Sequence, residues 1–285
     1  MKNIIRIFFI IIILINLCIS VSAADEELVF GVPAKKTAAK MYHAWLPIVN
    51  EVEKISGLKI QLKIVKDHQE LSRAIAEGTI DFGYFSPIPY VITSKDIGCD
   101  ALVMRVKYGS PYYKTAFIVK KNSPIMDLHG IIGLNLALTN PEDSTSGYYV
   151  PRAMLKMVGI DPEKDLKKII YSGKHINVLK TVSFGIADVG AIKLYILKDP
   201  ANKVYAEEVK VIAFSHFLPG STVAAAESMD AELKAELRKA FLDVSLTETG
   251  REALSGMDFN GFVAAEDELY RIIYEYLNTS ENGGD

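Results

Sequence analysis

Three consecutive hydroxyl side chains and a glycine form the most chemically suggestive run in this sequence, Ser144-Thr145-Ser146-Gly147. Apolar residues 131–138 before it are typical of a buried strand, and residues 152–158 after it continue as a helix. The first turn of a helix has backbone N–H groups without intrahelical partners and a partial positive charge. Such a turn can surround a tetrahedral anion with neutral donors, and its glycine lets the backbone come close.

A plain helix N-cap is the alternative interpretation of the same run. Asp143 or Ser144 alone would satisfy a cap. One cap explains one hydroxyl, however, and not three in a row followed by a glycine. Both interpretations stay open on residue types alone.

The sequence also contains the residue types of hydrolases and metal sites. Ser144 or Ser146 could form a triad with His175 and Asp188, but the Gly-x-Ser-x-Gly elbow of α/β-hydrolases is missing. The five histidines are scattered, with no short metal-ligand spacing. We therefore expect a binding protein without catalytic residues, metal or cofactor.

The elements that must position these residues alternate between strand and helix, which predicts an α/β fold with sheets flanked by helices. Strands are expected at residues 28–32, 58–65, 80–85, 101–106, 115–119, 132–138, 168–171, 188–192 and 209–213. Helices are expected at residues 37–55, 71–77, 231–242 and 267–277. Two extended passages, residues 113–120 and 212–223, look like crossings between two lobes. Ligands of open α/β sheets lie beyond the carboxyl ends of strands, so the cleft between the lobes is the expected site.

The N-terminus has the pattern of a cleavable export signal. Lys2 and Arg6 precede the apolar residues 7–17, and Val21-Ser22-Ala23 supplies small residues for a cut after Ala23. Cleavage would leave 285 − 23 = 262 residues and move the net charge from −3 to −5, because the signal carries two cations and no acid. A mildly acidic chain argues against nucleic acid as a partner. Only Cys99 would remain, so no intrachain disulfide is possible.

Three motifs together resemble the periplasmic substrate-binding proteins of phosphonate, phosphite and phosphate ABC importers, the PhnD-like family of type II periplasmic binding proteins. The first is the run 144–147 with Pro151 four residues later. The second is Gly78-Thr79-Ile80-Asp81-Phe82, followed by Tyr84-Phe85-Ser86-Pro87 and Tyr90. The third is Gly173-Lys174-His175 with Asp188 thirteen residues later. The resemblance covers essentially the whole mature chain.

The resemblance implies a two-lobed periplasmic-binding-protein fold, in which each lobe is a mostly parallel sheet flanked by helices and two crossover strands join the lobes. Residues 1–23 would be the signal peptide, and residues 24–117 with 217–285 the first lobe. Residues 118–216 would form the second lobe with the anion site. From composition, residues 279–285 are expected to be a disordered tail.

The resemblance also implies a set of ligand contacts. Ser144, Thr145 and Ser146, with Gly147, would hold the anion, and His175 would add a hydrogen-bond donor. The first lobe would close over the ligand with further side chains. Those expected from the first lobe are Tyr84, Phe85, Ser86, Tyr90 and His68.

Two departures from the family pattern bear on the ligand. Binders of aminoalkyl phosphonates hold the ammonium group with acidic residues, but residues 191–195 and 219–222 contain no carboxylate and Lys193 has the opposite sign. A buried ammonium without a counter-charge would cost several kcal/mol. Phosphite, phosphate or a small neutral-tailed phosphonate such as methylphosphonate is therefore expected.

The implied role is that of the periplasmic solute-binding component of an ABC importer, a monomer that delivers its oxyanion to a permease in the inner membrane. A soluble receptor that reports the ligand to a sensor kinase is the alternative, because both roles need the same closing cleft.

Overall fold

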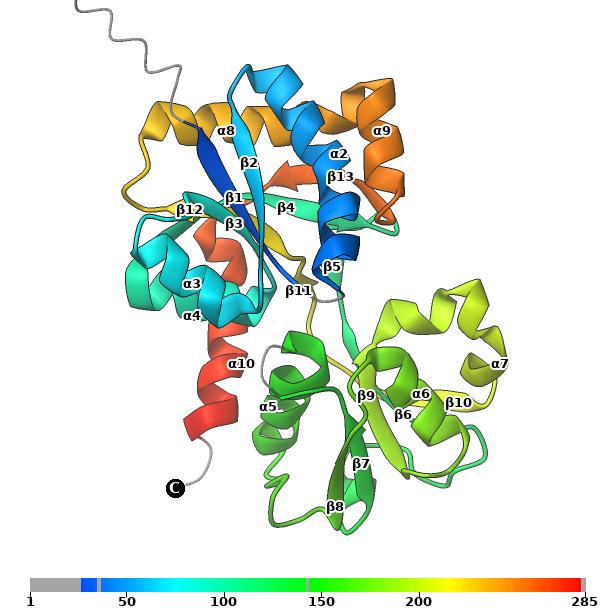
Figure 1. Ribbon diagram of the computed structural model, residues 1–285. Coiled ribbons are helices and arrows are strands. Elements are labelled where there is room, and N and C mark those ends of the chain that lie inside the picture. The colour runs from blue at the N-terminus through cyan, green and yellow to red at the C-terminus, as the bar shows by residue number, and fades with distance from the viewer. Residues whose placement is uncertain (1–26, 35–36, 142–143, 283–285) are drawn as a thin grey trace, which may run out of the picture.

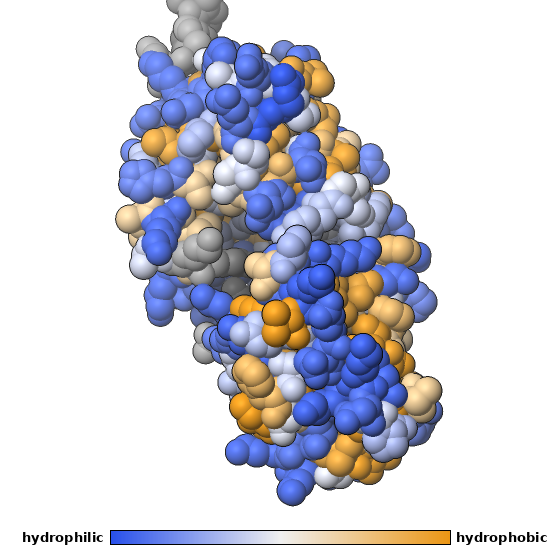
Figure 2. Space-filling model, turned by 90° about the vertical axis from the view of Figure 1, so that its right-hand side faces the viewer, coloured by the Kyte–Doolittle hydropathy of each residue, from blue (hydrophilic) through white to orange (hydrophobic). Residues whose placement is uncertain are grey.

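The structure is a computed structural model that describes residues 27–34, 37–141 and 144–282. The expected signal peptide lies outside the described residues, as do Glu142 and Asp143. Two lobes are joined at a narrow waist (Figure 1). Hydrophilic and hydrophobic residues are interspersed over both lobes on the face that Figure 2 shows. No helix in the described part of the chain is long and apolar enough to cross a membrane.

The first lobe is built on a six-stranded mixed sheet in the order β13-β4-β12-β3-β1-β2. Its strands are β1 (Leu28–Pro33), β2 (Ile60–Val65), β3 (Phe82–Phe85), β4 (Cys99–Lys107), β12 (Thr222–Ala226) and β13 (Phe259–Ala264). β1 pairs in parallel with β2 and β3, whereas β12 is antiparallel to both β3 and β4. The parallel β1 and β3 direct their carboxyl ends toward the second lobe (Figure 1).

Helices cover both faces of the first sheet because its strands are apolar on both sides. The helices are α2 (Ala38–Ser56), α3 (His68–Ala76), α4 (Pro87–Ile97), α8 (Ala231–Asp243), α9 (Glu248–Ser255) and α10 (Arg271–Asn282). α2, α8 and α9 bury Trp45, Phe241 and Leu254 against one face. α3 and α4 bury Leu71 and Ile88 against the other.

The second lobe is a five-stranded sheet in the order β10-β6-β9-β7-β8. Its strands are β6 (Thr115–Lys120), β7 (Asn135–Leu138), β8 (Lys168–Tyr171), β9 (Val189–Lys193) and β10 (Val209–Phe214). β7 pairs in parallel with β8 and β9, while β6 is antiparallel to β9 and β10. α5 (Val150–Met157) and α6 (His175–Ser183) pack on opposite faces, together with the short helix α7 (Lys203–Ala206). The carboxyl ends of β7, β8 and β9 therefore share one edge of the sheet.

Two passages connect the lobes, and they pair with each other. β5 (Tyr112–Tyr113) follows β4, and β11 (Leu218–Pro219) precedes β12. The two short strands form an antiparallel ladder at the waist. α10 also spans the lobes, because it packs on both α4 and α5 and its Ser280 carbonyl accepts a hydrogen bond from Lys156 Nζ at 2.7 Å (Figure 1).

The two-lobed α/β fold with helix-flanked sheets is confirmed, but both sheets are mixed and not mostly parallel. Antiparallel pairing enters because strands adjoining the crossings, β6 and β12, return into each sheet in the opposite direction. α4, α6, α7, α9 and β13 have no counterpart among the expected ranges, and β12 overlaps the expected crossing 212–223 only at Thr222 and Val223. α10 continues to Asn282, so helix occupies the first four residues of the expected disordered tail, whose residues 283–285 lie outside the described residues.

Cys99 gives a test of this packing. Its side chain is 2% exposed at the start of β4, and burial raises the pKa of its thiol to about 12. The thiolate is the reactive form, so the mature protein should react with iodoacetamide at pH 8 at least a hundred times more slowly when native than when unfolded in urea. Mass spectrometry of the labelled protein would measure both rates. Comparable rates would mean that β4 is accessible in the native protein.

Candidate functional site

A cavity of about 430 Å³ lies where the two lobes meet, and we call it the anion pocket. It is lined by Ser86, Pro87, Tyr113, Thr139, Asn140, Ser144, Thr145, Ser146, Gly173, Lys174, His175 and Lys193. None of these described residues carries a carboxylate, and two of them are lysines. The expected contacts Ser86, Ser144, Thr145, Ser146 and His175 are thus brought together in one place, from motifs far apart in the sequence.

Three helices begin at the anion pocket. α4 starts at Pro87 after β3, a π-helical turn (η3, Thr145–Tyr149) starts after β7, and α6 starts at His175 after β8. The first residue of each lines the cavity. The starts of η3 and α6 offer N–H groups without intrahelical partners and a partial positive charge, which favours an anion here despite the acidic net charge of the chain. The start of α4 adds only its partial positive charge, because Pro87 and Pro89 have no N–H and the Ile88 N–H is bonded to Thr145.

The hydroxyl run forms a tight turn, and Gly147 makes that turn possible. The Ser144 carbonyl accepts from the N–H groups of Tyr148 at 3.0 Å and Tyr149 at 3.3 Å, as in a π-helix. A Cβ at Gly147 would lie 2.1 Å from Thr139 Oγ1. Gly147 thus lies behind the pocket and lets the turn pack onto the end of β7, whereas the three hydroxyl residues line the cavity. Single π-turns occur frequently at functional sites.

Thr145 connects the two lobes. Its hydroxyl oxygen accepts a hydrogen bond from the backbone N–H of Ile88, in the first turn of α4, at 3.0 Å, and both groups are buried. The threonine of the second lobe therefore caps a helix of the first lobe. Since the Thr145 oxygen is used as an acceptor, its own hydrogen is left to donate into the pocket.

His175 is oriented by two contacts. Its Nδ1 accepts a hydrogen bond from the Lys193 N–H at 3.3 Å, so in the neutral ring Nε2 carries the hydrogen. Nε2 lies 3.4 Å from Ser146 Oγ. Asp188 lies at the opposite edge of the sheet, where its carboxylate accepts from the N–H and side-chain amide of Asn135 at 2.9 and 3.0 Å. Asp188 therefore does not complete a triad with the serine and the histidine.

Two buried hydroxyls of the anion pocket have no hydrogen-bond partner among the described residues: those of Tyr113 and Thr139. Tyr113 is 7% exposed and Thr139 2%. Burial and the neighbouring Tyr195 raise the pKa of Tyr113, while Arg105 and the nearby hydroxyls of Ser146 and Thr145 act in the opposite direction. The phenol thus stays a neutral donor. A buried polar group without a partner is costly, so both hydroxyls point to a ligand that would satisfy them.

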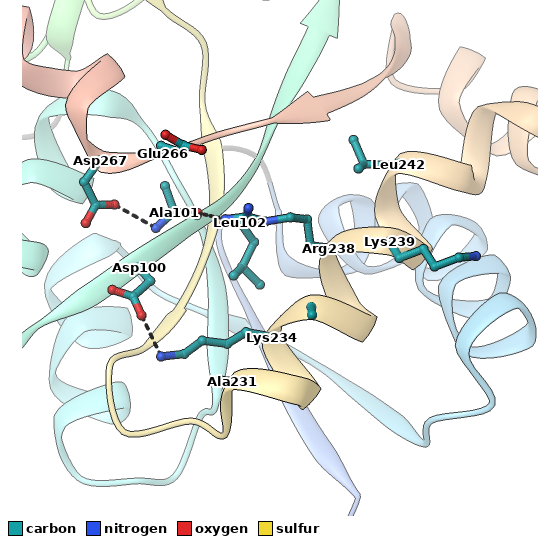
Figure 3. Close-up of a pocket in the computed structure, with 11 residues that line it drawn as sticks. Asp100, Ala101, Leu102, Ala231, Lys234, Arg238, Lys239, Leu242, Glu266 and Asp267 are labelled. Atoms are coloured by element: carbon teal, nitrogen blue, oxygen red, sulfur yellow. Dashed lines mark hydrogen bonds and ion pairs between the residues drawn. The ribbon is translucent and has the colours of Figure 1, made fainter.

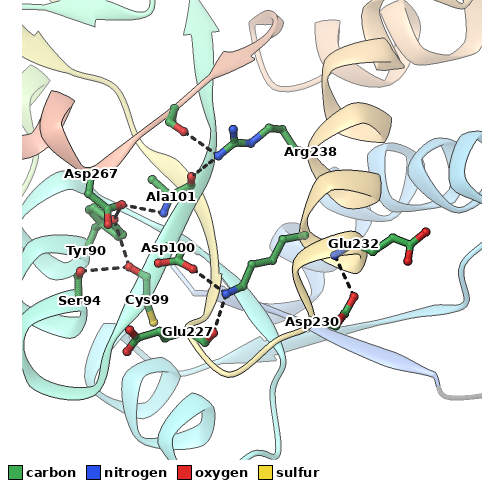
Figure 4. Close-up of polar contacts among 12 residues, drawn as sticks. Tyr90, Ser94, Cys99, Asp100, Ala101, Glu227, Asp230, Glu232, Arg238 and Asp267 are labelled. Carbon is green, nitrogen blue, oxygen red and sulfur yellow. Dashed lines mark hydrogen bonds and ion pairs between the residues drawn. The ribbon is translucent and has the colours of Figure 1, made fainter. Parts of the chain in front are cut away.

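Besides Gly147, four expected contacts lie outside the anion pocket, all from the first lobe. Alternation along β3 turns Tyr84 into the core beside α2, with its ring 4.6 Å from Trp45, and turns Phe85 to the other face, fully buried. His68 stacks on Phe85 at 5.9 Å and lines a separate cavity beside α3 and α4. The Tyr90 hydroxyl donates to Asp267 in the core (Figure 4). Of this segment only Ser86 and Pro87, between the end of β3 and the start of α4, line the pocket, whereas Tyr84, Phe85 and Tyr90 are buried in the first lobe.

Another cavity lies beside α8, and cations that line it already have partners within the protein (Figure 3). Lys234 Nζ lies 2.6 Å from Asp100, and Arg238 donates to the carbonyl groups of Ala101 and Ala265 at 3.1 and 3.2 Å (Figure 4). This cavity belongs to the first lobe alone. No group of three or more His, Cys, Asp or Glu in the described part of the chain could hold a metal ion.

Tyr113, Thr139, Asn140, Lys174 and Lys193 line the pocket but were not among the expected contacts. Thr139 and Asn140 directly follow β7, Lys174 precedes α6, and Lys193 ends β9. The rule that ligands lie at carboxyl ends of strands could have found these four. Tyr113 belongs to a crossing, and its sequence gives no such signal.

The fold and the pocket together define a two-lobed periplasmic binding protein. The family described as "ABC transporter, phosphonate, periplasmic substrate-binding protein" matches residues 30–270. The chain therefore belongs to the periplasmic substrate-binding proteins of phosphonate ABC transporters, which are binding proteins of transport systems and not enzymes.

Known relatives are similar over most of this chain. The phosphonates-binding periplasmic protein of Escherichia coli K12 is 22% identical over 249 residues, which are 85% of this chain and 73% of the relative. PhnD1 of Prochlorococcus marinus, solved with methylphosphonate, has a TM-score of 0.72 at 18% identity and covers 90% of this chain and 98% of its own. XAC2383 of Xanthomonas citri, solved with ATP, has a TM-score of 0.76 at 22% identity and covers 90% and 97%. These structural likenesses support the fold.

Proposed function

We propose that this protein captures a phosphorus oxyanion (phosphite, phosphate or a small phosphonate) in the anion pocket and delivers it to the permease of an ABC importer. The observation that carries the proposal is the convergence of three helix starts and the hydroxyl run on one cavity whose described lining residues carry no carboxylate. Methylphosphonate in the structure of PhnD1 supports the same ligand class.

Neutral donors would bind the oxyanion from several directions. The hydroxyl hydrogen of Thr145 is left to donate, because the Thr145 oxygen accepts from the Ile88 N–H. His175 also lines the pocket, with Nε2 3.4 Å from Ser146 Oγ. Tyr113 and Thr139 add two hydroxyls that have no hydrogen-bond partner among the described residues. A tetrahedral anion has enough acceptor oxygens for all of them, whereas a planar or larger anion would leave buried donors unpaired.

Lobe closure is the proposed mechanism of capture. Residues on the two sides of the waist already touch, since Ile88 bonds to Thr145 and the ring of Tyr108 lies 5.0 Å from that of Tyr195. Opening would break both contacts and pivot about β5 and β11. Ligand would favour the closed arrangement by its higher affinity for it, and the closed lobes would present themselves to the permease.

The remaining parts of the proposal concern its setting. Residues 24–117 with 217–285 and residues 118–216 are proposed as the two moving lobes, and the protein as a periplasmic monomer released by cleavage after Ala23. The N-terminal pattern of the sequence and the family of periplasmic proteins support this setting.

A thermal-shift panel on ligand-stripped mature protein tests the proposal. Phosphate, phosphite, methylphosphonate, 2-aminoethylphosphonate and sulfate would each be added. A ligand at a hundred times its Kd stabilises by about 2.7 kcal/mol, which a melting curve detects. We expect a selective shift with one or more phosphorus oxyanions. No shift with any of them would refute the proposed ligand class.

Lys193 should set the preference between phosphonates with a neutral tail and phosphonates with a cationic tail. Its Nζ lies 5.1 Å from the centre of the Tyr113 ring, at the edge of the anion pocket. We expect Lys193→Gln to weaken the binding of methylphosphonate about fivefold, because a partly exposed charge contributes about 1 kcal/mol. The variant should bind 2-aminoethylphosphonate more tightly, relative to methylphosphonate, than the wild type does. Calorimetry at two salt concentrations measures both effects. Lys180→Gln, which removes a distant lysine from the ring of Tyr205, is the control; equal responses of the two variants would contradict a local role for Lys193.

A further inference from the structure

A further cavity, of about 410 Å³, adjoins the anion pocket at the waist, and we call it the tail pocket. It is lined by Lys107, Tyr108, Ser110, Tyr112, Tyr113, Lys114, Leu194, Tyr195, Lys198, Phe214 and Phe217. Tyr113 lines both cavities. The ammonium of Lys193 lies within 6 Å of the rings of Tyr113 and Tyr195, at 5.1 and 5.9 Å, and so marks the boundary between them.

The tail pocket combines aromatic rings with cations. Lys114 Nζ lies 4.3 Å from the centre of the Phe217 ring, and Lys107 Nζ lies 5.2 Å from that of Tyr108. Lys107 also pairs with Asp258 at 3.3 Å. Lys114 and Lys198 have no ion pair with another described residue, and none of the lining residues carries a carboxylate. The Phe217 ring holds the ammonium of Lys114 in place without neutralising it, and Lys198 adds a second cation, which leaves this side of the cavity attractive to an anion.

The backbone is strained where the two lobes meet at this cavity. Tyr108 has φ of 52° and Gly109 has φ of 75°, in the two-residue turn between Lys107 and Ser110. A tyrosine is a poor choice at a left-handed position that favours glycine or asparagine. Here the turn carries the Tyr108 ring to 5.0 Å from that of Tyr195 in the other lobe. Backbone strain of this kind persists where the surrounding structure holds a residue in position, here the Tyr108 side chain against Tyr195.

We propose that the tail pocket is a second subsite for the ligand and that it takes an anionic tail. The preferred substrates are then phosphonates with a carboxylate on a short chain of methylene groups. The phosphonyl group occupies the anion pocket, the methylenes pass the ring of Tyr113, and the carboxylate reaches Lys193, Lys198 and Lys114. The apolar ring faces cover the methylenes, while an ammonium tail in the same place faces the like charges of Lys193, Lys198 and Lys114. This inference rests on the proposed function, since the head group must bind first.

Calorimetric titration of the mature protein tests the inference with three probes: methylphosphonate, 3-phosphonopropionate and 2-aminoethylphosphonate. We expect 3-phosphonopropionate to bind at least tenfold more tightly than methylphosphonate, and 2-aminoethylphosphonate to bind most weakly. Lys198→Met should reduce the advantage of 3-phosphonopropionate about threefold, because Lys198 is exposed and its charge is screened. Methylphosphonate should bind this variant as it binds the wild type.

Two controls separate the possible failures. Lys180→Met removes a lysine of the second lobe that lines neither pocket and whose Nζ lies 4.9 Å from the centre of the Tyr205 ring, and it should change none of the affinities. If methylphosphonate binds and 3-phosphonopropionate binds no more tightly, the tail subsite is refuted while the proposed function stands. If no phosphorus oxyanion binds, both are refuted.

Discussion

Thr145→Val should weaken the binding of methylphosphonate about a hundredfold while leaving the fold intact. Valine has nearly the shape of threonine but no hydroxyl. The change removes the donor to the anion, and it also removes the acceptor of the Ile88 N–H across the lobes. Each lost partner leaves a buried polar group unsatisfied at about 1–3 kcal/mol, and about 2.7 kcal/mol in total corresponds to a hundredfold.

Thr145→Ser is the matched control for this prediction, because it keeps the hydroxyl and loses only the methyl group. Calorimetry should give the serine variant an affinity within about fivefold of the wild type. Circular dichroism should show the same fold for all three proteins. An unchanged affinity of the valine variant would remove Thr145 from the site.

Tyr113→Phe should separate binding from stability. The Tyr113 hydroxyl is buried without a hydrogen-bond partner among the described residues, so its removal should leave the free protein as stable as before or more so. The same removal should weaken methylphosphonate at least tenfold, because the ligand would supply the missing partner. Melting temperatures with and without ligand measure both effects in one experiment.

Tyr270→Phe is the comparison for this second prediction. The Tyr270 hydroxyl is also buried, but it donates to the Gly220 carbonyl at 3.0 Å. Its loss should destabilise the free protein by about 1 kcal/mol and leave the ligand affinity nearly unchanged. If Tyr113→Phe behaves like Tyr270→Phe, the Tyr113 hydroxyl has a structural role and not a binding role.

The sequence was informative where chemistry and local structure coincide. Three hydroxyls before a helix predicted an anion site at residues 144–146, and the structure places these residues in the pocket with Ser86 and His175. The helix start after residues 144–147 could be located from its local signature, whereas the starts of α4 and α6 were not among the expected ranges. The contact of Ser144, Thr145, Ser146 and His175 with a ligand stays a prediction.

The first lobe was harder to read because a short strand gives no sign of which face meets the ligand. Tyr84 and Phe85 are adjacent on β3, and both are taken up by the core on opposite faces. Tyr90 is one turn into α4, where it packs on Tyr270 at 4.7 Å. Period-2 and period-3.6 patterns place side chains on faces, but only the packed fold decides which face is buried.

Tyr113 and Lys193 line the pocket, but that they lie together there could not be predicted from the sequence. Their importance arises from pairing of the crossings and from the order of strands in the second sheet, which bring β5 and the end of β9 together. Contacts of this kind link residues about 80 positions apart. A single sequence does not specify them, because many strand orders satisfy the same local pattern.

The crystal structure of the mature protein grown with methylphosphonate would test the central claim most directly. We predict the phosphorus atom in the anion pocket, with its oxygens within hydrogen-bond distance of Thr145 Oγ1 and the Tyr113 hydroxyl and with Ile88 still bonded to Thr145. Methylphosphonate bound beside α8 or in another cavity, with the anion pocket left to water, would contradict the account.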